Sequence, residues 1–239
     1  MPKEIIGILQ AKTGFSIPAA ENGIELYPLG RHLRGACGYI ALDSDLTIAD
    51  KFTDLNWDGV IFRDLIPVSR CDFQYEMDDR GVLIQCPECG DMYDLKMLKT
   101  VRTMTTQYKE IREGRKYRLS IIVQDEDYLN DIQKIVNIMK KTGIRLGQMK
   151  NSGHGLFVLR GWEIDDIDVY SGKNWRLLSD AVMPEGQKEI IIGKKIEKSD
   201  SFDKIRLRII PRGTVINKQF SGFALGTYTG LGFGEIDPL

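Results

Sequence analysis

The chain has 239 residues, of which 42% are hydrophobic and 28% are charged, as in an ordinary globular protein. Its net charge of −1 excludes a uniformly basic nucleic-acid-binding protein, although a basic stripe can be balanced by acids elsewhere. No apolar run reaches the length of about 18 residues that a membrane helix needs, and the N-terminal stretch MPKEIIGILQAKTG lacks the apolar region of a signal peptide. The sequence therefore predicts a cytoplasmic protein.

The first third of the chain predicts strand, helix and strand. Residues 4–10 (EIIGILQ) are β-branched and apolar, which is typical of a strand. Residues 29–42 have apolar side chains at helical spacing, but Gly35 and Gly38 each cost about 1 kcal/mol relative to alanine. We expect a backbone or a ligand to approach this helix closely. Residues 59–69 predict the next strand.

The middle of the chain predicts a hairpin and then a second strand–helix–strand unit. The turn DDRG separates two strand-like runs, and the cysteine motif CPECG follows the second of them. The basic run 95–107 comes next and is compatible with a helix. Residues 115–124 predict a strand by alternation. Residues 125–142 predict an amphipathic helix with acids at its start and Gly143 as its stop. A glycine-rich loop and the strand 155–164 follow.

These elements predict an α+β fold. Residues 1–168 form a ferredoxin-like or RRM-like βαββαβ core with a cysteine-containing insertion around residues 71–90. Residues 169–239 form a β-rich C-terminal extension that ends in a second glycine-rich loop.

Two glycine-rich loops each lead into a strand: LGQMKNSGHG before LFVLRGWEI, and LGTYTGLGFG before EI. Glycine-rich turns expose backbone N–H groups and let another chain approach, which suits phosphate. Neither loop has the lysine ending of a P-loop, and neither opens a helix as a dinucleotide-binding loop does. Tight β-turns with no ligand are the alternative.

The motif Cys86-Pro-Glu-Cys89-Gly90 resembles half of a structural zinc site, because its turn can point two thiolates at one metal ion. Cys71 lies across the predicted hairpin and is the natural third ligand. The fourth ligand stays open among Cys37, His32, Asp72, Asp91 and a partner chain. The alternative is that the cysteines are free.

The chain has two histidines, and each lies in a suggestive place. His32 stands between Arg31 and Arg34 on the predicted glycine-bearing helix, and His154 lies in the first glycine-rich loop. Either imidazole could act as a general base in RNA cleavage, because it titrates near neutral pH. A loop histidine that only forms hydrogen bonds or stacks is the alternative.

Three segments together resemble the RAMP proteins of CRISPR effector complexes. The segment IELYPLGRHLRGACGYI resembles the family's first strand-to-helix motif. Gly114 and the loop residues Gly147, Ser152, Gly153 and Gly155 match glycine and serine positions of the second half of the RAMP domain. The final LGTYTGLGFGEI resembles the glycine-rich end of the same superfamily.

The resemblance implies a subunit of an antiviral ribonucleoprotein complex that binds CRISPR guide RNA. Its partners would be the guide, a complementary target nucleic acid and other effector subunits, including copies of itself. The RNA would contact backbone amides and cations rather than base-reading side chains. The implied contact residues are Arg31, His32, Arg34, Gly147, Lys150, Asn151, Ser152, Gly153, His154 and Gly155.

Departures from the RAMP pattern indicate whether the expected RNA-binding subunit is catalytic. Leu29, Gly30, Arg31 and His32 stand where the family has small residues, and the loop 11–23 contains Glu21 but no aspartate. Backbone subunits that cut target RNA carry an aspartate in this loop, so we expect a non-catalytic, repeated backbone subunit. The alternatives are a subunit that caps the 5′ handle of the guide and a metal-independent guide-processing endoribonuclease that uses His32 or His154. A ferredoxin-like protein with structural zinc and no RNA role is a fourth possibility.

Overall fold

The computed structural model describes most of the N-terminal core and parts of the C-terminal extension. The described residues are 1–17, 28–54, 57–68, 98–102, 107–111, 113–148, 150–178, 181–182, 191–192, 198–202, 205–210, 214–225, 229–231, 234 and 236–238.

One antiparallel sheet forms the core of the N-terminal part. Its strands are β1 (Lys3–Ala11), β2 (Val60–Phe62), β3 (Ile66–Val68), β6 (Lys116–Val123), β7 (Ile144–Arg145) and β8 (Leu156–Asp166). The order across the sheet is β2-β6-β1-β8-β7, and β3 also pairs with β6. The first strand of the chain is therefore central, between β6 and β8.

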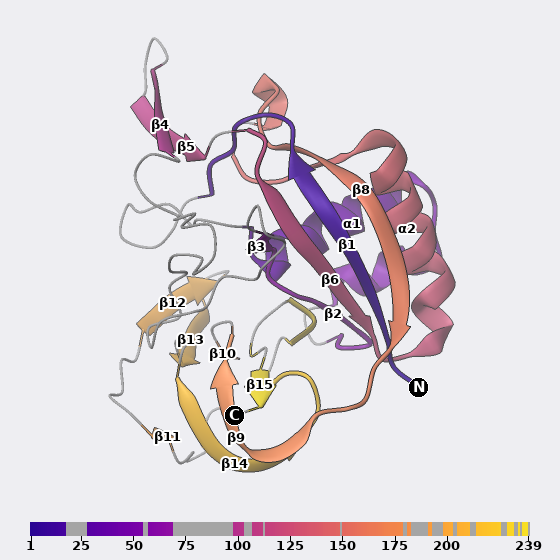
Figure 1. Ribbon diagram of the computed structural model, residues 1–239, viewed down its shortest axis with the longest axis vertical. Coiled ribbons are helices and arrows are strands. Elements are labelled where there is room, and N and C mark those ends of the chain that lie inside the picture. The colour runs from indigo at the N-terminus through magenta and orange to yellow at the C-terminus, as the bar shows by residue number, and fades with distance from the viewer. Residues whose placement is uncertain are drawn as a thin grey trace.

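The helices α1 (Gly30–Asp43) and α2 (Leu129–Thr142) cover one face of this sheet. In Figure 1, α1 passes behind the strands, and the opposite face of the sheet is turned toward the viewer. The elements β1, α1, β2/β3, β6, α2 and β8 follow one another in βαββαβ order. This order and the strand arrangement are those of a ferredoxin-like fold, so the predicted fold class is confirmed.

Strand alternation decides which side chains meet the helices. Ile5 and Leu9 of β1 are fully buried in the helix-side core, whereas Ile6 and Ile8 between them point to the opposite face and are half-buried. Leu119 and Ile121 of β6 follow the same rule. Each such burial stabilises the fold by about 1.5–3 kcal/mol.

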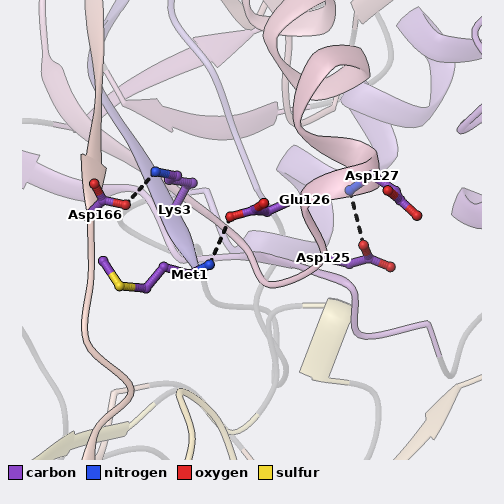
Figure 2. Close-up of polar contacts among 6 residues, drawn as sticks. All are labelled: Met1, Lys3, Asp125, Glu126, Asp127 and Asp166. Atoms are coloured by element: carbon purple, nitrogen blue, oxygen red, sulfur yellow. Dashed lines mark hydrogen bonds and ion pairs between the residues drawn. The ribbon is translucent and has the colours of Figure 1, made fainter.

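The predicted second helix is confirmed, together with the polar contacts at its start. The Asp125 carboxylate accepts a hydrogen bond from the Asp127 N–H over 3.1 Å in a short 3₁₀ turn, η4 (Glu126–Tyr128), that leads into α2. Figure 2 shows two ion pairs nearby: Lys3 to Asp166 at 2.5 Å, and the Met1 amino group to Glu126 at 2.8 Å. These contacts join the start of β1 to the end of β8 and to the α2 entry.

Two sequence predictions differ from the structure. The predicted strand 59–69 is split into β2 and β3, and Asp64 lies in the break. The basic run 95–107 was predicted as helix-compatible, but it contains β4 (Leu98–Arg102), which pairs with β5 (Gln107–Ile111). The helix prediction was wrong because β-branched Thr100 and Val101 favour a strand once a partner is available.

The C-terminal part is rich in β-strands, as predicted. One sheet contains β9 (Ser171–Leu177), β11 (Ile191–Ile192), β14 (Val215–Ser221) and β15 (Ile236–Pro238). Another contains β10 (Ala181–Val182), β12 (Lys198–Phe202) and β13 (Ile205–Ile210). Phe223 packs with Ile61 and Ile122, which joins this part to the main sheet. The domain boundary at residue 168 stays a prediction.

Within the described ranges, no helix is long and apolar enough to span a membrane. The hairpin and cysteine motif of residues 71–90 lie outside the described residues.

Candidate functional site

The first glycine-rich loop, residues 146–155, joins β7 to β8 and is closed at its base. The Leu146 N–H donates a hydrogen bond to the Gly155 carbonyl over 2.9 Å. Gly155 has φ +71°, and a Cβ at this position would lie 2.0 Å from the Leu146 carbonyl oxygen. Glycine is therefore required at residue 155 for the loop to close.

The backbone at the base of this loop is engaged with the segment after β1. The Gly155 N–H donates to the Gly14 carbonyl over 2.9 Å, and the Gln148 N–H donates to the Ser16 carbonyl over 2.8 Å. A Cβ on Gly147 would lie 2.5 Å from the Ser16 carbonyl oxygen. The structure thus uses Gly147 and Gly155 for chain packing.

The tip of the loop is the part that is open to a ligand. A short 3₁₀ turn, η5 (Lys150–Ser152), forms the tip, and Lys150, Asn151 and Gly153 are exposed. No atom lies within 4 Å of a Cβ placed on Gly153. Lys150 therefore presents its charge beside accessible backbone.

His154 is paired with a buried acid. Its Nδ1 lies 2.9 Å from an Oε2 of Glu110, whose side chain is 1% exposed. Gly14 makes room for this carboxylate, because a Cβ there would lie 2.3 Å from Glu110 Oε1. The Arg145 side chain donates to the His154 carbonyl over 3.1 Å. The pair fixes the orientation of the imidazole and connects the loop to β5.

The start of α1 is held by a carboxylate from the break between β2 and β3. Buried Asp64 accepts a hydrogen bond from the Gly30 N–H over 2.7 Å. A carboxylate at this end of a helix is favoured, because the free N–H groups and the helix dipole are positive there. Asp64 thereby fixes the position of Arg31 and His32.

His32 is neutral in this setting. Its pKa is lowered to about 4, mainly by burial and to a smaller extent by the positive charges of Arg31 and Lys150. Its Nδ1 accepts a hydrogen bond from the Leu29 N–H over 3.2 Å, so the single proton belongs on Nε2. The charge of Lys150 at the loop tip thus acts on a side chain at the start of α1.

Arg34 has a structural position. It is 2% exposed, and its guanidinium donates to the carbonyls of Lys51, Phe52, Asp54 and Trp57. Burial lowers its pKa to about 10, which leaves the group charged at neutral pH. The guanidinium also lies 5.3 Å from the centre of the Trp57 ring. Its donors are used inside the fold, so we leave Arg34 out of the candidate site.

The second glycine-rich loop has the local geometry of the first. The Leu225 N–H donates to the Gly234 carbonyl over 2.7 Å, Gly234 has φ +70°, and a Cβ there would lie 1.8 Å from the Leu225 carbonyl oxygen. A 3₁₀ turn, η6 (Thr229–Leu231), lies at the same offset as η5. Within η6, a Cβ on Gly230 would lie 1.9 Å from the Trp57 carbonyl oxygen. The second loop therefore packs onto the segment that Arg34 holds.

The predicted zinc ligands Cys71, Cys86 and Cys89 lie outside the described residues, as do Asp72 and Asp91. The described part of the chain contains no group of three potential metal ligands. Cys37 is buried between the helices, with its Sγ 4.0 Å from the Met139 Sδ, and burial raises the pKa of its thiol. The zinc site stays a prediction.

No family model matches the chain, and no curated protein matches it. Solved structures do match it. A structure described as CRISPR associated protein Cas6 aligns over 100% of both chains, with a TM-score of 0.53 and 12% identity. A chain of the Csm1–Csm4 cassette in complex with pppApA aligns over 93% of this chain and 89% of its own length, with a TM-score of 0.52 and 12% identity. The chain therefore shares its fold with these two CRISPR proteins.

The RAMP resemblance expected from the sequence is thus confirmed at the level of the fold. A chain of the type III-B Cmr-β complex bound to cognate target RNA also matches, with 16% identity and a TM-score of 0.46. That match covers 68% of this chain, which spans 60% of the length of the Cmr-β chain.

Sequence reasoning missed two acids that organise the candidate site. Asp64 interrupts the apolar run VIFRDLIPV, and a carboxylate inside such a run is a signal of a buried capping role. Glu110 pairs with His154 across 44 residues of sequence, and no local pattern indicates that pairing.

Proposed function

We propose that this chain is a guide-RNA-binding structural subunit of a multi-subunit CRISPR ribonucleoprotein, and that it is the repeated backbone protein. One observation carries the proposal: the tip of the first glycine-rich loop presents exposed Lys150 and Asn151 beside Gly153, around which the space is open. Arg31 at the start of α1 adds a second positive charge, which together with that of Lys150 contributes to the lowered pKa of His32. We call Arg31, His32, Lys150, Asn151 and Gly153 the loop-tip site.

The chemistry of the loop-tip site suits a sugar–phosphate backbone. Cations and accessible main-chain groups bind phosphate without regard to sequence, and neutral His32 can donate one hydrogen bond from Nε2. A guide held in this way keeps its bases free to pair with a target. The fold that this chain shares with a subunit of the Csm1–Csm4 cassette supports a place in such a complex.

The test compares a double variant of the loop-tip site with a matched control. Arg31→Gln/Lys150→Gln removes its cations, and Lys140→Gln/Lys173→Gln removes exposed cations from the end of α2 and from β9. We expect the site variant to bind labelled single-stranded CRISPR-repeat RNA roughly tenfold more weakly in fluorescence anisotropy, with a salt slope reduced by about 1.4. An equal loss in the control variant contradicts the loop-tip site.

The stoichiometry of the purified particle tests the backbone role. A backbone protein is expected to co-purify with RNA as an oligomer of several copies per guide, measured by light scattering together with absorbance at two wavelengths. One copy per guide contradicts the backbone role and favours the subunit that caps the 5′ handle.

A second candidate function rests on the contact between His154 and Glu110. A carboxylate that orients an imidazole is the arrangement of a general base, which could remove the proton from a 2′-hydroxyl. If this chain is an endoribonuclease, the wild-type protein cleaves repeat RNA in the presence of EDTA. Both His154→Ala and Glu110→Gln are then expected to abolish cleavage. The loop-tip variant Arg31→Gln/Lys150→Gln should retain cleavage at saturating RNA. Absence of cleavage by the wild-type protein rejects this function.

A further inference from the structure

The sheet face turned away from the helices carries cations among aliphatic side chains. On β1 this face bears Ile6, Ile8 and Gln10, because the alternate residues pack into the helix-side core. Ile8 lies directly opposite Arg118, and Gln10 lies opposite Lys116. The two cations therefore stand in adjacent rows beside the central strand.

The neighbouring strand β8 contributes a third cation, which the structure holds in place. Exposed Arg160 donates from Nε to the Gln10 Oε1 over 2.9 Å, and its Nη2 contacts the same oxygen. Gln10 donates in turn to the Gly114 carbonyl over 3.3 Å. The guanidinium is thereby fixed beside β1 while its remaining N–H groups stay available.

An aliphatic floor lies between these cations. Its members are Ile6, Ile8, Ile66, Val68 and Val158, all half-buried. Ile66 and Val68 stand opposite Arg118 and Lys116, and Val158 stands opposite Gln10. None of the five belongs to a hydrophobic cluster in the part of the chain that the structure describes.

Acids are kept to the other end of this face. Buried Glu4 accepts a hydrogen bond from the Ser120 hydroxyl at 2.5 Å and lies 3.5 Å from the Arg63 guanidinium. It also lies 3.9 Å from Arg118, which remains one-third exposed. Beyond the bulge in β8, Asp165 stands opposite Glu4, and exposed Glu163 stands opposite Ile6. Positive charge therefore dominates the end that contains Lys116 and Arg160.

We infer that this end of the sheet is a second binding surface for single-stranded nucleic acid, distinct from the loop-tip site. We call Ile8, Gln10, Lys116, Arg118 and Arg160 the sheet-face site. Its cations would bind phosphates, and bases would cover the aliphatic floor. Lys116 and Arg118 are about 7 Å apart along the strand, which is comparable to the step between phosphates of an extended strand.

Nucleic acid fits the sheet-face site better than an acidic protein segment. The main-chain groups of β1 and β6 are already paired within the sheet, so a peptide lying on the face would gain no ladder hydrogen bonds. A nucleotide strand needs none, because its bases have flat faces that cover apolar side chains and its phosphates attract cations. The first glycine-rich loop also runs directly into β8, so both sites border one end of the sheet.

The test removes the two exposed cations and leaves Arg118, which contacts Glu4. Lys116→Gln/Arg160→Gln is compared with the control Lys140→Gln/Lys173→Gln, with thermal melts to check folding. The probe is a labelled single-stranded oligouridine of about 20 nucleotides, which exceeds one site. We expect roughly tenfold weaker binding and a salt slope lower by about 1.4 in the sheet-face variant, and no change in the control.

A second measurement does not depend on variants. RNA containing 4-thiouridine, crosslinked to the wild-type protein by ultraviolet light, is expected to label peptides that contain Ile8 or Val158. Unchanged RNA affinity of the double variant, or crosslinks that avoid both peptides, overturns the inference. So does a result in which the variant loses only binding to a polyglutamate peptide, because that result assigns the face to a protein partner.

The loop-tip site and the sheet-face site can be rejected independently of each other. If Arg31→Gln/Lys150→Gln has no effect and Lys116→Gln/Arg160→Gln weakens binding, the loop-tip site is rejected and the sheet-face site stands. The reverse pattern rejects the sheet-face site alone.

Discussion

The Leu146 N–H and the Gly155 carbonyl, 2.9 Å apart, close the first glycine-rich loop in a way that leaves no space for a side chain at residue 155. The loop in turn presents Lys150, whose charge acts on His32 at the start of α1. Its closure is therefore a condition for the loop-tip site, and Leu225 and Gly234 repeat it in the C-terminal loop.

Gly155→Ala is predicted to destabilise the protein by about 2–5 kcal/mol, because strain at positive φ adds to a clash with the Leu146 carbonyl. Gly234→Ala should behave alike. Gly153→Ala is the matched control: its φ is +89°, but its surroundings are open, so only about 1–2 kcal/mol of strain is expected. Urea unfolding measures all three. Equal losses for Gly153→Ala and Gly155→Ala would show that the clash is relieved.

Arg34→Met is predicted to lower the free energy of unfolding by at least about 2 kcal/mol, because the buried carbonyls that accept from its guanidinium lose their donors. Arg34→Lys should recover only part of this loss, since one ammonium cannot reach all of these acceptors. Chemical denaturation checks the order wild type, lysine, methionine. If Arg34→Met unfolds like the wild type but loses RNA binding, the structural assignment fails and Arg34 returns to the loop-tip site.

His32 predicts a loss of stability in acid. Its folded pKa is about 4 and the ordinary value is 6.5, so the unfolded chain binds the proton first as the pH falls. The stabilisation is complete above about pH 6.5 and is lost as the pH falls toward 4, with a total on the order of 3 kcal/mol. His32→Gln should flatten this part of the stability–pH curve. NMR titration gives the direct check, because the chain has only two histidines to resolve. A His32 midpoint near 6.5 would contradict the prediction.

The sequence motif at Cys86 and Cys89 predicts one structural zinc ion per chain, with Cys71 as a third ligand. Metal analysis of the purified protein should find that ion, and Cys86→Ser/Cys89→Ser should lose it. Cys37→Ser is expected to keep the ion, because its buried thiol lies beside Met139 between the helices; loss of zinc in this variant would make Cys37 the fourth ligand. Metal-free wild-type protein would reject the site.

The elements predicted most accurately are those whose signals are local. Strand β1 alternates between Ile5 and Leu9 on one face and Ile6 and Ile8 on the other, and α2 carries its own stop signal at Gly143. The strand β4 was mistaken for helix because its pairing with β5 depends on a partner that the run itself does not reveal. Hydrophobic periodicity predicted the type of an element correctly only where residues within that element determine its structure.

The site was predicted in part for the same reason. The loop glycines and Lys150 form a motif that can be read from contiguous residues. Arg34 looked like a surface cation because Arg31 and His32 lie beside it, but its environment is made by carbonyls 17 to 23 residues away. The partner of His154 lies 44 residues earlier in the sequence. Whether a charged side chain is buried depends on contacts with residues far away in the sequence, and the local spacing of residue types does not reveal such contacts.

The central place of β1 has a consequence for biosynthesis. Glu4 and Ser120, which meet across β1 and β6, are 116 residues apart, so the first strand leaves the ribosome long before its neighbour exists. At about 5–20 residues per second, this interval is on the order of ten seconds. Throughout it, a segment rich in isoleucine has two open edges, which favours capture by chaperones or misassociation with other nascent chains. Expression temperature and chaperone supply should therefore affect the yield of folded protein more than the composition of its mature surface would indicate.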